Sequence, residues 1–215
     1  MFTRVLAAWL VCAALCLAAG AASNADPFDM DFERPDVVSL NGAWETVRDH
    51  AGEEIWKDEV AAALPGWEVA TIPGSLVPGV KQPEHRNVKL VWARKTFTIS
   101  RGQAGRDAVL KWNSIRYGVT VWINGSRVAG HPVTGPHTVL LPGKLLREGS
   151  NRIVLKVPGW AGLPKSRSGY PLLPTGSGTQ GWGRKDPGIM DHIWIEFYDR
   201  VYLKWVLAMP DLANG

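Results

Sequence analysis

The sequence predicts an all-β protein, an antiparallel β-sandwich of the jelly-roll type. Residues 119–124 alternate between apolar and other side chains with a period of two, which is typical of a strand with one buried face. Asn124-Gly125 ends this run, and these two residues tolerate the positive φ that a type I′ hairpin turn requires. About nine segments of this kind, separated by Gly, Pro, Asn and Ser, indicate a sandwich.

The other strands follow from the same pattern of apolar, β-branched and aromatic residues. The only segment with helical character is 51–64, which ends at Pro65-Gly66. Six tryptophans lie in strand patterns and are expected in core or half-buried positions: Trp44, Trp92, Trp112, Trp122, Trp194 and Trp205. In chain order, strands are expected at residues 39–44, 67–72, 89–99, 108–112, 119–129 (a hairpin), 137–141, 152–157, 192–198 and 201–207.

The first 25 residues have the pattern of a secretory signal peptide. Arg4 is the only charge, an apolar core runs over residues 5–19, and small residues precede a cleavage point near Ala25. A membrane anchor is the weaker interpretation, because the run is shorter than the roughly 18–20 residues that a span needs. We expect a secreted or periplasmic protein with no membrane attachment after cleavage. Both cysteines, Cys12 and Cys16, lie in this segment, so the mature chain has no disulfide.

The rest of the chain is predicted to hold one domain. We expect an irregular segment at 26–38, the sandwich at 39–208, and the start of a linker to a missing downstream domain at 209–215. The formal net charge is +4, and basic residues are intermixed with acids, so no basic stripe favours a nucleic-acid partner. The 11 tryptophans favour a carbohydrate partner instead, because sugar C–H faces pack on indole rings.

Residues 158–188 form a long Gly- and Pro-rich segment without periodicity. Connections of this length inside a domain are usually functional or disordered, and disordered linkers seldom keep aromatic residues. We therefore expect an ordered loop that carries a sugar site. Its candidate residues are the aromatic side chains and the charged rim beside them: Trp160, Tyr170, Trp182, Arg184 and Asp186.

No motif predicts catalysis or metal binding. Gly176–Gly181 matches G-x-G-x-x-G, but no strand precedes it and no helix follows it. The histidines lack metal-ligand spacing; His131 and His137 flank one loop and are interpreted as satisfied polar residues that could be neighbours. Glycoside hydrolysis needs two carboxyl groups across one sugar, and those of this chain lie in polar segments. Glu196 shares a strand face with Trp194 and is expected to face solvent.

Six segments in order carry a family resemblance. They resemble the N-terminal sugar-binding domain of family 2 glycoside hydrolases, which include β-galactosidases, β-glucuronidases and β-mannosidases. The resemblance implies a galactose-binding-like jelly roll without a cofactor; such folds often hold a structural calcium ion, which this sequence does not itself indicate. The segments are Leu40–Trp44, Trp67–Pro73, Val91–Phe97, Val121–Gly125 with His131, Gly149–Val157 and Gly188–Ile195.

The resemblance also implies what this chain does. The catalytic glutamates of the family lie in a separate barrel domain, so the expected function is a non-catalytic carbohydrate-binding accessory domain, a fragment of a secreted β-glycosidase. His131 joins the sugar-site candidates on this ground. The chain departs from the family at residues 132–137, where relatives often have Gly-Gly-Tyr-x-Pro-Phe. Two alternatives stay open: an interaction module that packs on a partner protein without binding sugar, and a small hydrolase using its own carboxylates.

Overall fold

The described residues form an antiparallel β-sandwich, as the sequence predicts. The computed structural model describes residues 33–49, 65–81, 84–131, 134–169, 186–199 and 201. The expected signal peptide (1–25), the helical segment (51–64), most of the last expected strand (201–207) and the expected linker (209–215) lie outside these residues.

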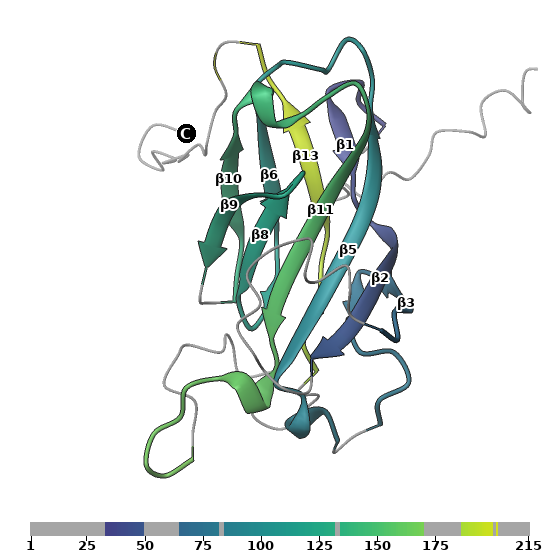
Figure 1. Cartoon of the computed structure of the whole chain (residues 1–215). Coiled ribbons are helices and arrows are strands. Elements are labelled where there is room, and N and C mark those ends of the chain that lie inside the picture. The colour runs from purple at the N-terminus through teal and green to yellow at the C-terminus, as the bar shows by residue number, and fades with distance from the viewer. Residues whose placement is uncertain are drawn as a thin grey trace, which may run out of the picture. The chain divides into compact units, whose positions relative to one another are not determined.

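Two main sheets pack face to face, and every strand pair in them is antiparallel (Figure 1). The chain passes repeatedly from one sheet to the other, as in a jelly roll. The four-stranded sheet has the order β1 (Val37–Ser39), β13 (Ile193–Phe197), β6 (Ala108–Trp112), β10 (His137–Leu141). The six-stranded sheet has the order β3 (Glu68–Ile72), β2 (Gly42–Asp49), β5 (Leu90–Ile99), β11 (Gly149–Pro158), β8 (Val119–Ile123), β9 (Ser126–His131).

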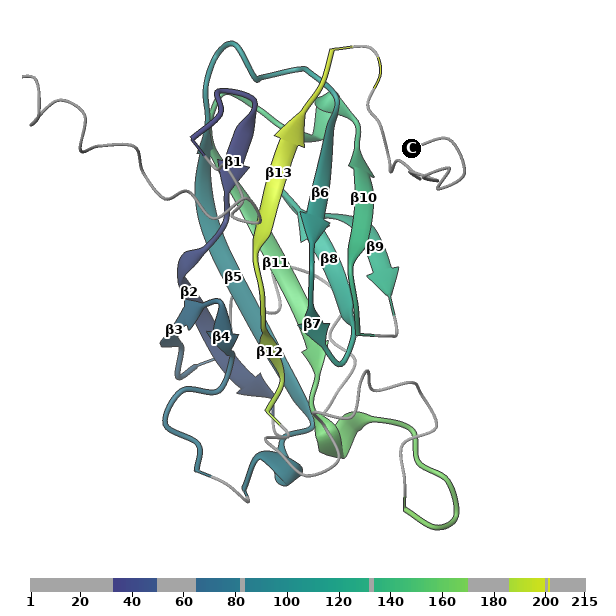
Figure 2. The same cartoon turned by 180° about the vertical axis from the view of Figure 1, so that it is seen from behind.

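A small third sheet prolongs the four-stranded one. Figure 2 shows β12 below β13 and β7 below β6 along the same two lines of chain. This sheet has the order β4 (Gly74–Ser75), β12 (Gly188–Ile189), β7 (Ile115–Arg116), and three short 3-10 helices complete the described elements: η1 (Glu84–Asn87), η2 (Gly143–Leu145) and η3 (Trp160–Gly162).

The main core lies between the two sheets and is built by strand alternation. On β11, Ile153, Leu155 and Val157 are fully buried and point inward, and Leu110 on β6 and Ile195 on β13 meet them from the other sheet. Burying each such side chain contributes about 1.5–3 kcal/mol relative to leaving it exposed. The alternation read from the sequence therefore selects the correct inward face.

The expectation of one buried face for the strand at 119–124 is wrong. Trp122 points away from the main core but is only 3% exposed, and it lies 5.5 Å from the equally buried Trp92 on β5. Val47 and Val154 complete this second cluster, and Trp67 packs against it. The six-stranded sheet is therefore buried on both faces at its centre. A period-two pattern shows that Trp122 points outward, but it does not show whether other side chains cover that face.

Two strands begin earlier in the chain than the sequence predicts. β1 begins at Val37, inside the segment 26–38 that was expected to be irregular, because its residues pair with Glu196 and Ile195 of β13. β11 begins at Gly149 rather than residue 152, since its pairing with β5 extends to Ile99. Pairing with a neighbouring strand extends strands beyond their apolar runs, and sequence periodicity does not contain that information.

Two asparagines that stand 27 residues apart fasten the hairpin to β11. Asn124 adopts φ 48° in the β8–β9 turn, as predicted for a type I′ turn, and its Nδ2 donates to Oδ1 of Asn151 over 2.8 Å. Asn151 is 1% exposed, accepts from the backbone N–H of Arg147, and donates to the carbonyls of Arg147 and Gly149. Asn124 in turn accepts from the N–H of Arg152.

We predict that Asn151→Ala lowers the free energy of unfolding by about 2–4 kcal/mol, because it leaves several buried donors and acceptors without partners. Urea unfolding followed by tryptophan fluorescence measures this change. Asn87→Ala, at an exposed position, is the matched control and should shift stability by less than about 0.5 kcal/mol. Equal stability of the two variants would contradict the role given to Asn151.

Candidate functional site

A buried ion pair lies where the small third sheet forms. Arg116 on β7 places Nη1 at 3.4 Å from Oδ1 of Asp186, just before β12, and the two side chains are 14% and 2% exposed. Gly188 pairs with Arg116 in the sheet, and this pairing brings Asp186 to Arg116, which lies 70 residues earlier in the sequence. The pair links Asp186, near the end of the long loop, to β7. Removing either partner would leave an uncompensated buried charge.

Tyr117 follows Arg116 and is the most unusual polar residue of this region. It is 1% exposed, and its hydroxyl has no hydrogen-bond partner among the residues that the structure describes. Burial raises the pKa of Tyr117 to about 12, since the phenolate would be poorly solvated there. Its ring meets that of Trp160, with centroids 5.9 Å apart.

The segment that carries Trp160 is anchored to the sandwich. The N–H of Gly159 donates to the carbonyl of Lys89 over 2.8 Å, and the N–H of Ala161 donates to the carbonyl of Val88 over 2.9 Å. A Cβ at Gly159 would collide with the backbone of Val88, so only glycine permits this approach. Leu163 is 4% exposed and closes the turn. Trp160, half-buried on η3, is thereby held against Tyr117.

A separate hollow opens where β6 and β9 end and β10 begins. It encloses about 570 Å³, within the usual range for small-ligand sites. The rings of His131 and His137 stack within it, with centroids 4.1 Å apart and planes inclined by 22°, and Trp112 lies 5.5 Å from each. The described lining residues are Lys111, Trp112, Asn113, His131, Pro136, His137, Thr138 and Trp194.

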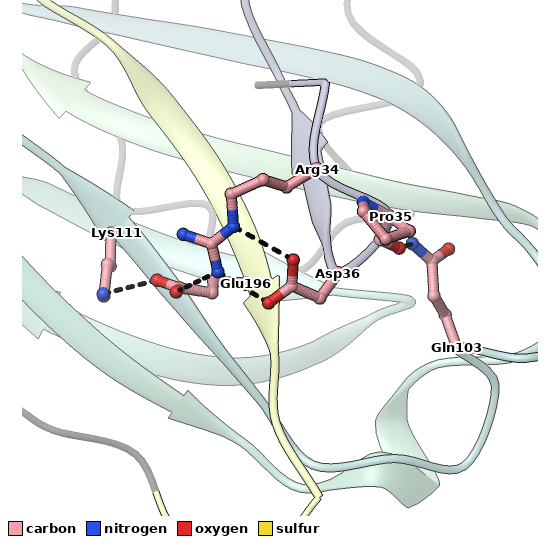
Figure 3. A network of polar contacts seen from close by, with 6 residues as sticks. All are labelled: Arg34, Pro35, Asp36, Gln103, Lys111 and Glu196. Atoms are coloured by element: carbon pink, nitrogen blue, oxygen red, sulfur yellow. Dashed lines mark hydrogen bonds and ion pairs between the residues drawn. The ribbon is translucent and has the colours of Figure 1, made fainter. Parts of the chain in front are cut away.

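A chain of charged groups on the outer face of the four-stranded sheet holds one wall of the hollow (Figure 3). Lys111 Nζ lies 2.6 Å from Oε2 of Glu196, whose other oxygen lies 3.2 Å from Nη2 of Arg34. Arg34 also pairs with Asp36 over 2.7 Å. Gln103 fastens the same segment by donating to the carbonyl of Pro35. Glu196 shares its face with Trp194, as expected, but it is held in ion pairs rather than left free in solvent.

The predicted site residues fall into two groups. Trp160 and Asp186 both adjoin Arg116-Tyr117, whereas His131 belongs to the hollow. Tyr170, Trp182 and Arg184 lie outside the described residues, so the site expected from the long loop is described only in part.

Several residues of both sites were not evident from the sequence. Tyr117 and Arg116 stand beside the hairpin motif, but the pattern gave no sign that Asp186 would reach them. Lys111 and Trp112 belong to a plain strand pattern. The spacing of His131 and His137 around one short loop was the only usable signal, and the structure confirms that they are neighbours.

Several carboxyl groups of the described residues form ion pairs with basic side chains. A general acid of a glycoside hydrolase needs a raised pKa. The hydrogen bond from Arg34 instead lowers the pKa of Asp36, and the hydrogen bond from Arg94 lowers that of Glu45. Asp186 and Glu196 are held in ion pairs with Arg116 and with Lys111. The hydrogen bonds to Asp36 and Glu45 favour the ionised form of these two carboxylates.

Among the described residues, no group of three or more His, Cys, Asp or Glu side chains is placed to hold a metal ion. His131 and His137 contact each other through their stacked rings. Within the described segments, no helix has the length and hydrophobicity needed to cross a membrane.

Comparisons with solved structures relate this sandwich to glycosidases. A glycosyl hydrolase family 2 member from Bacteroides cellulosilyticus matches 76% of this chain at 20% identity with a TM-score of 0.51. A β-D-glucuronidase from Dictyoglomus thermophilum matches 78% at 19% identity and a TM-score of 0.57. A β-D-mannosidase from the same organism matches 76% at 14% identity and a TM-score of 0.54. The chain has the fold of a part of family 2 glycoside hydrolases.

The match covers only a minor share of those enzymes. The family 2 fold region spans 21%, 29% and 23% of the three chains, respectively. By sequence, no family model and no curated protein matches this chain. The likeness therefore establishes the family 2 sandwich fold for the described residues.

We predict that Tyr117→Phe raises the free energy of unfolding at pH 8 by about 1 kcal/mol, since it removes a buried hydroxyl without a partner. With the pKa of Tyr117 raised to about 12, the wild type should also lose about 2 kcal/mol between pH 10 and pH 12, because the unfolded state ionises there more readily than the folded state. Urea unfolding across this range should show a smaller alkaline loss for the variant. An unchanged alkaline loss would contradict the prediction.

His131 should make stability depend on pH at the acidic end. Burial, and secondarily the neighbouring His137, lower the pKa of His131. Below the ordinary histidine pKa of about 6.5 the unfolded chain binds a proton more readily, so stability present above that pH is lost as pH falls. Thermal unfolding at pH 7.5 and 5.5 should show a smaller drop for His131→Gln than for the wild type. Equal drops in both proteins would contradict this assignment.

Proposed function

We propose that this chain is a non-catalytic, carbohydrate-binding accessory domain of a secreted family 2-type β-glycosidase. The observation that carries the proposal is the shared fold: more than three quarters of the chain superposes on solved enzymes named as a family 2 member, a β-glucuronidase and a β-mannosidase. The share of those enzymes that is matched, below one third, supports a part that works together with a catalytic domain. The hydrolysis of O-glycosyl bonds then belongs to the parent enzyme.

Two features of the described residues support carbohydrate as the ligand. The hollow at His131 and His137 combines aromatic walls with polar groups, the composition that sugar rings and their hydroxyls require. Trp160 is half-buried on an anchored turn beside Tyr117, so its ring is held in place rather than mobile on a linker. A rigid aromatic side chain loses little entropy when a sugar packs on it.

The proposed partners follow from this assignment. Carbohydrate with β-linked residues is one, and the catalytic domain of the glycosidase is the other. The signal-like residues 1–25 support export, so the domain would act in the periplasm or outside the cell, where polysaccharides are encountered.

We predict that the purified chain binds a β-linked oligosaccharide on a glycan array and releases no phenol from aryl β-glycosides. Trp160→Ala and Trp182→Ala are expected to weaken binding by about tenfold or more if the loop supplies a stacking platform, since such a contact contributes about 1–2 kcal/mol. Leu140→Ala, at a position 57% exposed on β10, is the matched control and should bind as the wild type does.

Two results would contradict the proposal. Turnover of an aryl β-glycoside that a single carboxylate substitution abolishes would make the chain an enzyme. Absence of any glycan binding, together with tight binding to a separately produced family 2 catalytic domain, would make it an interaction module.

A further inference from the structure

The two main sheets meet along one side of the sandwich at a pair of edge strands. β9 is the outermost described strand of the six-stranded sheet, and β10 is the outermost described strand of the four-stranded sheet. Both views show them side by side (Figures 1 and 2). Among the described strands, β9 pairs only with β8, and β10 pairs only with β6. Side chains rather than backbone pairing therefore close the seam between β9 and β10.

Two histidines close this seam at the end where the chain crosses from β9 to β10. His131 is the last residue of β9 and His137 is the first of β10, and their ring centroids lie 4.1 Å apart. His131 pairs with Val119, a residue of the main core. His137 pairs with Trp112, another core residue, so both imidazoles lie on the inner face. The stacked rings contact Trp112, which is 1% exposed, and thus cover the end of the main core.

The surroundings of the stack favour uncharged rings. Nε2 of His137 is buried and has no hydrogen-bond partner among the described residues, so an imidazolium there would hold a buried N–H group without an acceptor. Burial, and secondarily the neighbouring His137, lower the pKa of His131. Two imidazolium rings at the separation of this stack would also repel each other.

The charged side chains of the four-stranded sheet lie on its other face. Lys111 of β6 and Glu196 of β13 form an ion pair on the outer face, where Figure 3 shows them in one network with Arg34. The stacked rings lie on the inner face, and β10 has no charged residue after His137. The Glu196 carboxylate is therefore not placed to neutralise the stack.

The strands of the six-stranded sheet beside the stack add no acid to it. Arg127 of β9 pairs with Trp122, which points away from the main core, so Arg127 lies on the outer face. β8 has no titratable side chain, and residues 132–136, which link β9 to β10, have none either. On these elements no carboxylate balances a positive charge on His131 or His137.

We propose that the His131–His137 stack is a pH-sensitive switch on the seam between the two sheets. Neutral rings close the seam over Trp112. As the pH falls, the open seam binds a proton that the stacked rings disfavour, so the end of β10 separates from β9 and Trp112 becomes accessible to water. The switch takes up a proton from solvent and needs no other reactant. It does not depend on carbohydrate binding, so its test is independent of the proposed function.

Proton linkage sets the direction and size of the effect. Because the pKa of His131 is lowered in the closed seam, the closed form loses stability as the pH falls below the ordinary histidine pKa of about 6.5. When one histidine titrates normally in the open seam and the stack takes up no proton, the open fraction rises about tenfold between pH 7.5 and pH 5.5.

Amide hydrogen exchange of the full chain, followed by NMR, measures this opening. After correction for the intrinsic pH dependence of exchange, the backbone amides of β10 should exchange about tenfold faster at pH 5.5 than at pH 7.5. The amides where β5 pairs with β11 are the internal control. They should change much less, because local opening of the seam leaves that pairing intact.

Matched variants assign the acceleration to the stack. The double variant His131→Phe with His137→Phe keeps two aromatic rings that take no charge, so its β10 amides should exchange at equal corrected rates at both pH values. His131→Gln should lose most of the acceleration and serves if the double variant does not fold. His192→Gln removes a histidine that contacts Asn41 instead, and it should keep the tenfold acceleration. Thermal unfolding at pH 7.5 shows which variants are folded.

Faster exchange that is confined to the seam and lost without the histidines supports the switch. Three results overturn it. The first is equal exchange of the β10 amides at both pH values. The second is an equal acceleration in β5 and β11, because the whole domain then loses stability together. The third is an acceleration that survives the loss of His131, either in the double variant or in His131→Gln.

Discussion

The pairing of β11 with β5 is the constraint on which the other parts of this molecule depend. It runs over the full length of both strands, from Gly149 opposite Ile99 to Pro158 opposite Leu90. β11 carries the inward residues of the main core, while Val154 points outward into the second cluster with Trp92. A slip of one residue would exchange these two faces and place every side chain wrongly. The Asn124–Asn151 clasp, at the end where β11 begins, resists that slip.

Both candidate sites derive their geometry from this strand. Beyond Pro158 the chain turns at once onto Val88 and Lys89, which brings Trp160 to the ring of Tyr117. On its other side β11 holds β8, and β8 holds β9, whose last residue is His131. The ends of neighbouring strands in a rigid sandwich are suited to hold side chains of a binding site at fixed separations.

Many charged side chains of the described residues form ion pairs that join neighbouring strands and segments. Arg34, Asp36, Glu196 and Lys111 form one continuous network over the outer face of the four-stranded sheet, and Arg116 with Asp186 closes the small third sheet. Within this network the hydrogen bond from Arg34 lowers the pKa of Asp36, which favours the ionised form of that carboxyl group. The hollow at His131 differs because its described lining has donors and titratable rings without a carboxylate.

The sequence by itself determined the sandwich, the type I′ turn at Asn124-Gly125, and the inward face of most strands, because period-two alternation and turn chemistry are local properties. It also indicated a resemblance to the N-terminal domain of family 2 glycoside hydrolases, and the structural comparison shows that fold. Only the tertiary structure decided that Trp122 packs on Trp92 in a second cluster, that Arg116 reaches Asp186, and that His131 stacks on His137 beside Trp112. These are contacts between distant segments, and they depend on which strands become neighbours and in what register, which no local pattern encodes.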